Sequence, residues 1–193
     1  MPAFFIVGSA RSGTTLVRLL MNAHPMVVVP PESRFIVEFW TGEDTVEVKP
    51  FLDRLAIHPR FRVWDLPISD VAAEVRVERM PYALLIEKVY EAYARPRGKP
   101  IWGDKTPRYI EHLGLLRRLF PDARFIHVIR DGRNVALSYA DVPFGPKSVA
   151  AAAELWSRRV SSGLSARKTI PKESYLEVRY EDLDLPRRHK GSP

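Results

Sequence analysis

A glycine-rich segment near the start of the chain has the residue types and spacing of a phosphate-binding loop. The stretch VGSARSGTTL, residues 7–16, places Gly8 and Gly13 in the pattern G-x-x-x-x-G. An apolar run precedes it and a helical pattern follows it, so backbone N–H groups at a helix start would converge on one anion. The alternative is that the two glycines only form a turn.

The residues after the second glycine indicate which anion this loop suits. A nucleoside triphosphatase continues with Lys and then Ser or Thr, which bind the terminal phosphates and magnesium. Here Thr14 and Thr15 follow, and Arg11 lies inside the loop, where its planar guanidinium can hold an oxyanion. We therefore predict a site for a smaller anionic group without a metal ion, formed by Arg11, Ser12, Gly13, Thr14 and Thr15.

A second anion site is predicted from FIHVIRDGRNVALSY, residues 125–139. Arg130 follows a buried-strand pattern, at the edge of the sheet where open α/β folds bind ligands. Ser138 comes eight residues later, about two helical turns on, and we predict that both bind a second phosphate. In the alternative, Arg130 only pairs with Asp131 or with another surface acid.

Composition limits the class of protein. The 193 residues are 46% apolar and 27% charged, which indicates one globular domain over residues 1–193. The net charge of +7 favours an anionic ligand, but the basic residues are dispersed, which argues against nucleic acid. There is no cysteine and no apolar run of the ~20 residues that cross a bilayer, so we expect a cytoplasmic protein.

Apolar runs alternate with helical patterns along the chain. Strand-like runs occupy residues 3–8, 26–33, 123–129 and 174–180. Helical periodicity occupies residues 12–24, 81–93, 109–120, 134–142 and 148–168, whereas residues 41–80 have no strong period. This alternation predicts an α/β fold with a mainly parallel sheet.

Several of these segments together resemble a known family. SARSGTTL resembles the 5′-phosphosulfate loop, and RFIHVIRDGRNVALSY the 3′-phosphate motif, of the sulfotransferases that use 3′-phosphoadenosine 5′-phosphosulfate (PAPS). The pairs His24–Pro25 and Glu32–Arg34, GDKTP at residues 103–107 and the late YLEVRYEDL are similar to the tyrosylprotein sulfotransferase branch. The resemblance implies a P-loop nucleotide-kinase-like, three-layer α/β/α fold.

The resemblance also implies roles. Arg11 and residues 12–15 would hold the 5′-phosphosulfate, Arg130 and Ser138 the 3′-phosphate, and Tyr180 would contact the nucleotide. Lys105 would stabilise the leaving phosphate, and Glu32 would be the general base. The implied product is 3′,5′-adenosine bisphosphate, with no metal ion. The residues alone leave Glu32 open as a helix N-terminal acid and Lys105 as a solvated lysine beside Asp104.

The acceptor and the end of the chain are less defined. We expect a hydroxyl on a small molecule, glycan or lipid, bound by a helical region at residues 35–100, and the oligomeric state is open, a homodimer included. The chain ends about a dozen residues after its last predicted strand, so the C-terminal elements that cover the donor in this family are expected to be missing. Two other functions remain: a P-loop kinase of a nucleotide or small molecule, and a non-catalytic nucleotide-binding remnant.

Overall fold

The fold is built on a five-stranded parallel sheet, which the computed structural model describes within residues 3–183. The strand order is β2-β5-β1-β6-β7, and every neighbouring pair is parallel. The strands are β1 (Phe4–Gly8), β2 (Val27–Val28), β5 (Ile101–Lys105), β6 (Arg124–Ile129) and β7 (Tyr175–Arg179).

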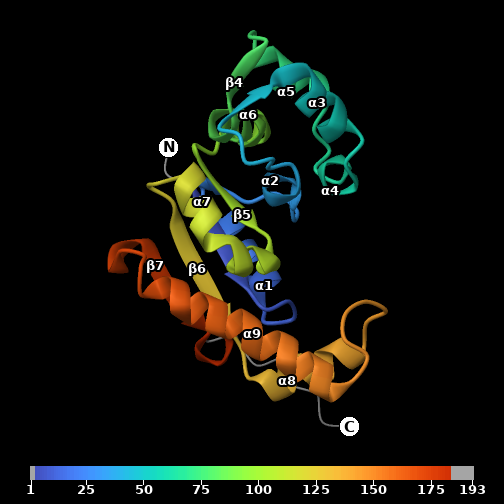
Figure 1. Ribbon diagram of the computed structural model, residues 1–193, viewed down its shortest axis with the longest axis vertical. Helices are drawn as coiled ribbons and strands as arrows, with labels where there is room; N and C mark the ends of the chain where they lie inside the picture. Colours follow the sequence, from blue (N-terminus) through green and yellow to red (C-terminus); the bar gives the residue numbers. More distant parts are fainter. Residues whose placement is uncertain (1–2, 184–193) are drawn as a thin grey trace.

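Helices cover both faces of this sheet. On one face α1 (Thr14–Ala23) packs Val17 against the alternate strand residues Phe4 and Ile6. On the other face Phe5 belongs to the larger core, together with residues of α7 (Leu113–Leu119) and of the 3₁₀ helix η2 (Pro107–His112). α9 (Val149–Arg167) crosses this second face, and α8 (Gly132–Ala140) packs against α9 (Figure 1). The predicted P-loop-like α/β class is confirmed.

Residues 35–100, which we call the helical lobe, lie at one end of the long axis of the molecule, and α8 lies at the other (Figure 1). Short helices and a small antiparallel hairpin, β3 with β4, make up the lobe. Its elements are α2 (Phe35–Glu38), β3 (Thr45–Glu47), α3 (Val48–Ala56), α4 (Pro59–Arg62), α5 (Ile68–Ala73), β4 (Arg79–Pro81), α6 (Tyr82–Ala94) and the 3₁₀ helix η1 (Arg95–Arg97).

Aromatic rings join the helical lobe to the sheet. Tyr90 of α6 stacks on Trp102 of β5 with ring centroids 4.2 Å apart. Trp64 packs edge-on against Tyr90 at 5.0 Å and lies 5.4 Å from Phe35. One hydrophobic cluster therefore contains residues of both the lobe and the sheet.

Several elements of the sheet and of its flanking helices differ from the sequence prediction. β5 was not predicted, because Gly103, Asp104 and Lys105 interrupt its apolar pattern. β2 is only two residues long, since the prolines that follow lack the N–H that a longer strand needs. The helix expected at residues 109–120 is divided into η2 and α7. The predicted lack of donor-covering elements concerns the end of the chain, and residues 184–193 lie outside those described.

Candidate active site

All five strands of the sheet deliver a predicted residue to the same edge. Because the strands are parallel, their carboxyl ends meet there. β1 leads into the glycine loop, and the turn after β2 carries Glu32. β5 ends on Lys105, while Arg130 and Tyr180 directly follow β6 and β7.

The glycine loop is folded as an anion-binding loop. Gly13 has φ 89° and Arg11 has φ 69°, both in the left-handed region. α1 begins at Thr14, and within residues 3–183 no side chain caps its N-terminus, so the N–H groups of its first turn remain for a ligand. Ser12 and Thr14 are buried and Thr15 is exposed.

Arg11 links this loop to the predicted second anion site. Its Nε donates a hydrogen bond to Ser138 Oγ at 2.9 Å, and its carbonyl oxygen accepts one from Arg130 Nη1 at 3.1 Å. The Arg130 guanidinium lies 4.5 Å from the centre of the Tyr180 ring. That ring packs so closely on Gly13 that any side chain there would collide with it. The structure thus brings five predicted residues into one connected group.

Asp131 is not the partner of Arg130. Its carboxylate accepts hydrogen bonds from the Arg133 side chain, 2.6 Å to Nη2, and from the Arg133 backbone N–H at the start of α8. Arg130 is oriented instead by its contacts to the loop, and Trp156 of α9 donates a hydrogen bond from Nε1 to the Arg130 carbonyl oxygen at 2.9 Å. Trp156 is a supporting residue that no sequence motif indicated.

Glu32 and Lys105 form a second group beside the loop. Lys105 Nζ lies 3.6 Å from one oxygen of Glu32, and Arg34 Nε donates to the other at 2.8 Å. Lys105 is buried, so it is not a solvated surface lysine. Burial lowers the pKa of Lys105, and the carboxylates of Glu32 and Asp104 oppose that shift. Glu32 precedes α2 by three residues and faces two cations rather than a helix N-terminus.

A cleft of about 490 Å³ opens over Glu32, Lys105 and the Arg11 side of the glycine loop. Arg130, Ser138 and Tyr180 do not line it. Among the residues that the structure describes, its lining holds six cationic side chains and one acid, Glu32. The lining residues are Ala10, Arg11, Thr14, Thr15, Glu32, Arg34, Arg60, Lys105, Pro107, Arg108, Phe144 and Arg159. A larger groove of about 960 Å³, along α3 and α5, contains none of the predicted residues.

The arginines of the cleft were only partly visible in the sequence. Arg34 belongs to the motif that carries Glu32. Arg60 comes from the helical lobe, and Arg159 comes from α9, where it pairs with Glu111 at 3.2 Å. Neither has a local sequence signal, because only the tertiary fold brings α4 and α9 to this edge.

Nothing in the described residues forms a metal site or a membrane span. Within residues 3–183, no group of three or more His, Asp or Glu side chains is placed to hold a metal ion. None of the helices in that range is both long and apolar enough to cross a bilayer.

Comparison with known proteins identifies relatives. A family model described as "Sulfotransferase family" matches residues 2–185. Protein-tyrosine sulfotransferase 1 of Mus musculus is 31% identical over 133 residues, which is 69% of this chain and 32% of the relative. Nodulation protein NoeE of Sinorhizobium fredii is 32% identical over 162 residues, or 78% of this chain and 36% of the relative. The chain thus spans about a third of the length of these curated relatives.

Two solved structures share the fold. The sulfotransferase domain of the curacin biosynthetic pathway has a TM-score of 0.63 and 22% identity, over 95% of this chain and 69% of that one. The sulfotransferase domain of the Synechococcus PCC 7002 olefin synthase has a TM-score of 0.66 and 24% identity, over 95% and 67%. At these identities the likeness establishes the fold alone.

Proposed function

The chain belongs to the sulfotransferase family, and we propose that it transfers a sulfuryl group from PAPS to a hydroxyl acceptor without a metal ion. The observation that carries this proposal is the connected group of Arg11, Gly13, Arg130, Ser138 and Tyr180 directly beside Glu32 and Lys105. It offers two anion positions and an acid–base pair at one sheet edge.

The residues present fit the two anionic ends of this donor. The uncapped N-terminus of α1, with Arg11, suits the 5′-phosphosulfate, and Arg130 with Ser138 suits the 3′-phosphate. Within the described residues the buried Ser12 Oγ and Arg130 Nε have no hydrogen-bond partner. Buried polar atoms are seldom left unpaired, so both atoms are suited to bind such a ligand.

A kinase fits this site less well. Thr14 and Thr15 stand where a Walker loop carries Lys and then Ser or Thr, so the usual lysine for the terminal phosphates is missing. At the end of β6, where a P-loop triphosphatase organises magnesium with an acid, Arg130 comes first and Asp131 is paired with Arg133.

Glu32 and Lys105 would perform the proton and charge chemistry. When bound, the donor supplies an activated sulfuryl group, and its transfer mainly requires positioning and stabilisation of negative charge. The Glu32 carboxylate, which lies between Arg34 and Lys105, would take the proton of the acceptor hydroxyl. The buried Lys105 ammonium would stabilise the charge that develops on the departing phosphate.

The acceptor would enter the cleft from the side of Arg34, Arg60 and Arg108. We propose a hydroxyl on a small molecule, glycan or lipid, a class that differs from the protein tyrosine in the name of the mouse relative. Of the helical lobe expected to bind it, Arg60 alone lines this cleft, so the lobe would act on the acceptor through α4.

Calorimetric titration with 3′,5′-adenosine bisphosphate, without magnesium and with ATP as the comparison, tests the proposal. Micromolar binding of the bisphosphate and none of ATP would support it. A chain that does not bind the bisphosphate contradicts it, and ATP binding that appears only with magnesium identifies a kinase. Bisphosphate binding without consumption of PAPS in any acceptor screen identifies the non-catalytic remnant.

A further inference from the structure

The short segment between Glu32 and α2 has an unusual backbone. Arg34, its third residue, has φ 61° and ψ −32°, a left-handed conformation that side chains other than glycine seldom adopt. Such a conformation costs on the order of 1–3 kcal/mol and persists only when the surroundings enforce it. The side chains that hold residues 33–36 therefore decide where Glu32 lies.

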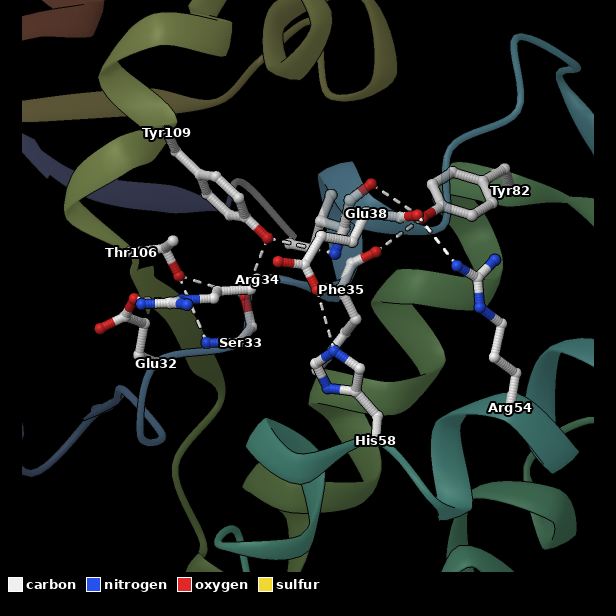
Figure 2. Close-up of polar contacts among 11 residues, drawn as sticks. Glu32, Ser33, Arg34, Phe35, Glu38, Arg54, His58, Tyr82, Thr106 and Tyr109 are labelled. Carbon is white, nitrogen blue, oxygen red and sulfur yellow. Dashed lines mark hydrogen bonds and ion pairs between the residues drawn. The ribbon is translucent and has the colours of Figure 1, made fainter.

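Two hydroxyl groups hold this segment from the side of the sheet (Figure 2). Thr106 Oγ1 accepts a hydrogen bond from the Ser33 backbone N–H and lies 3.3 Å from Ser33 Oγ. Tyr109 OH accepts one from the Ile36 N–H at 3.1 Å and lies 3.1 Å from Ser33 Oγ. Ser33, Thr106 and Tyr109 are all buried, so water does not replace these bonds.

These hydrogen bonds lie next to Glu32 and Lys105 in the chain. Thr106 directly follows Lys105, and Ser33 directly follows Glu32. The bond between Ser33 and Thr106 therefore connects the two segments that carry the acid–base pair. None of the three buried residues lines the cleft, so they act on the pair through the backbone.

The helical lobe holds the same segment from the opposite side (Figure 2). Tyr82 OH donates to the Ile36 carbonyl oxygen at 2.8 Å, and Arg54 donates to the Glu38 carbonyl oxygen at 3.2 Å. These contacts fix α2 itself. They lie further from Glu32 than those of Thr106 and Tyr109 do.

We propose that Thr106 and Tyr109 are positioning residues, which hold the carboxylate of Glu32 at its distance from the ammonium of Lys105. The proposal rests on the proposed function for its catalytic meaning, but the geometry itself is testable without catalysis. Removal of either hydroxyl should release residues 33–36 and let the Glu32 carboxylate move away. The electrostatic coupling of the pair then falls, because it depends on their separation.

The coupling is measurable by NMR of protein labelled with ¹³C at the lysine ε carbons. The Lys105 signal is assigned by its loss in Lys105→Arg. The change in the Lys105 pKa caused by Glu32→Gln measures the electrostatic coupling between the two side chains. Combining Glu32→Gln with each hydroxyl variant in a double-mutant cycle separates this coupling from the effect of the hydroxyl variant alone. Arg18 and Asp104 also act on the Lys105 pKa, and Thr106 is a hydrogen-bond partner of Asp104. The cycle subtracts this direct effect of each substitution, because it is present with and without Glu32.

We expect Glu32→Gln to lower the Lys105 pKa in the otherwise native chain. In the backgrounds Thr106→Val and Tyr109→Phe this shift should shrink to about half or less. Thr106→Ser keeps the hydroxyl and should restore the full shift. If catalysis is confirmed, Thr106→Val should also lower kcat while the KM for PAPS stays the same.

Tyr175→Phe is the matched control. It removes another buried hydroxyl, which donates to the Gly163 carbonyl oxygen at 2.9 Å and contacts His127 Nδ1 at 2.8 Å, on the remote strand β7. This variant should keep the full shift. Thermal unfolding checks that each variant is folded, and if Tyr109→Phe fails, the comparison of Thr106→Val with Thr106→Ser remains decisive.

Two results would overturn the proposal. One is a full shift in folded Thr106→Val and Tyr109→Phe. The other is an equal reduction in Tyr175→Phe, which would mean that any lost buried hydroxyl has this effect. The proposed function is tested separately, by binding of 3′,5′-adenosine bisphosphate. Its failure would therefore be distinguishable from failure of the positioning role, which is tested by the Lys105 pKa.

Discussion

The sheet edge and the helical lobe are opposite kinds of surroundings in one small chain. At the sheet edge, cationic side chains surround a cleft that contains one acid. In the lobe, aromatic rings from α2, α4 and α6 pack against one another and against Trp102 of the sheet. Charged residues of the proposed site are therefore concentrated in loops at strand ends, and aromatic packing is concentrated in the lobe.

Substitutions in the two regions should therefore have different effects. Changes at the sheet edge should alter binding or turnover with little loss of stability, because the side chains there are polar and face a cleft. Changes in the lobe should alter stability first. The exception is Arg60, the lobe residue that lines the cleft.

The largest expected effect tests the lobe as a packed scaffold. Trp64 is fully buried among aromatic rings, so Trp64→Ala should lower the free energy of unfolding by about 3–5 kcal/mol, measured by urea denaturation. Ile57→Ala, at a site that is 75% exposed, should change it by less than about 0.5 kcal/mol. A small loss of unfolding free energy for Trp64→Ala would contradict the view that the lobe is the packed scaffold of the molecule.

The next effect concerns a buried polar group beneath the sheet edge. Burial lowers the pKa of His127 from 6.5 to about 4. Because the unfolded chain binds this proton more readily, stability should be full above pH 6.5 and fall by about 3 kcal/mol as the pH falls to 4. Denaturant unfolding between pH 4 and 7 measures this slope.

His127→Gln, which does not titrate, should flatten this dependence on pH, whereas the exposed His24→Gln should leave it in place. The structure gives the reason. Tyr175 OH donates to the Gly163 carbonyl oxygen, so His127 Nδ1 is the donor to Tyr175, and in the described residues the buried Nε2 has no partner for a second proton. An equal slope in His127→Gln would assign the acid sensitivity to other groups.

Removal of the proposed base tests the chemistry of the sheet edge. Glu32→Gln keeps the shape of the side chain but cannot accept a proton, so turnover should fall by ~10²-fold or more while bisphosphate affinity changes little. Glu38→Gln, which alters the nearby contact of Glu38 with His58, should leave turnover nearly intact. Normal turnover in Glu32→Gln would remove Glu32 from the mechanism.

The second anion position should give a smaller, selective effect. Arg130→Ala should weaken binding of 3′,5′-adenosine bisphosphate by about tenfold, since a charge-assisted hydrogen bond is lost. It should scarcely change binding of adenosine 5′-phosphosulfate, which has no 3′-phosphate. Arg133→Ala, three residues away and paired with Asp131, should affect neither ligand. Equal losses for both ligands would show that Arg130 does not distinguish the 3′-phosphate.

The smallest expected effect concerns Arg60, the residue of the helical lobe that lines the cleft. Arg60→Ala should raise the KM for an acceptor by about three- to tenfold and leave that for PAPS unchanged, as expected for a contact at a solvent-exposed cleft wall. Arg62→Ala, in the same helix but outside the cleft lining, should change neither. An unchanged acceptor KM in Arg60→Ala would place acceptor binding outside the helical lobe.

The sequence was most informative where chemistry and local pattern coincide. Arg11, Arg130 and Ser138 were predicted from motifs that follow strand patterns, and the structure brings them into contact. Apolar runs located β1 and β6, because strands buried on both faces need continuous apolar residues. β7 was also predicted, although it is an edge strand of mixed residues in which only Tyr175 is buried. The roles of these residues in binding and catalysis stay predictions.

Other parts could not be predicted, for physical reasons. β5 carries Asp104 and Lys105 in a buried strand, so two charged residues break the apolar pattern that identifies strands. β3 and β4 are three residues each and pair across more than 30 residues, a separation that no local signal records. Arg60 and Arg159 are single arginines on helices, and only tertiary packing shows that they face the cleft.

The double use of Arg11 has a thermodynamic consequence. Its guanidinium donates a hydrogen bond to Ser138 while its carbonyl oxygen accepts one from Arg130, so a ligand at one of the proposed anion positions would change the groups available at the other. A molecule that carries both anions on one ribose meets an arrangement that is already connected. Its two halves, offered as separate fragments, would act on the same arginine, and their affinities should not combine into that of the intact molecule. Binding of the proposed donor at this sheet edge would in that sense be cooperative within a single ligand.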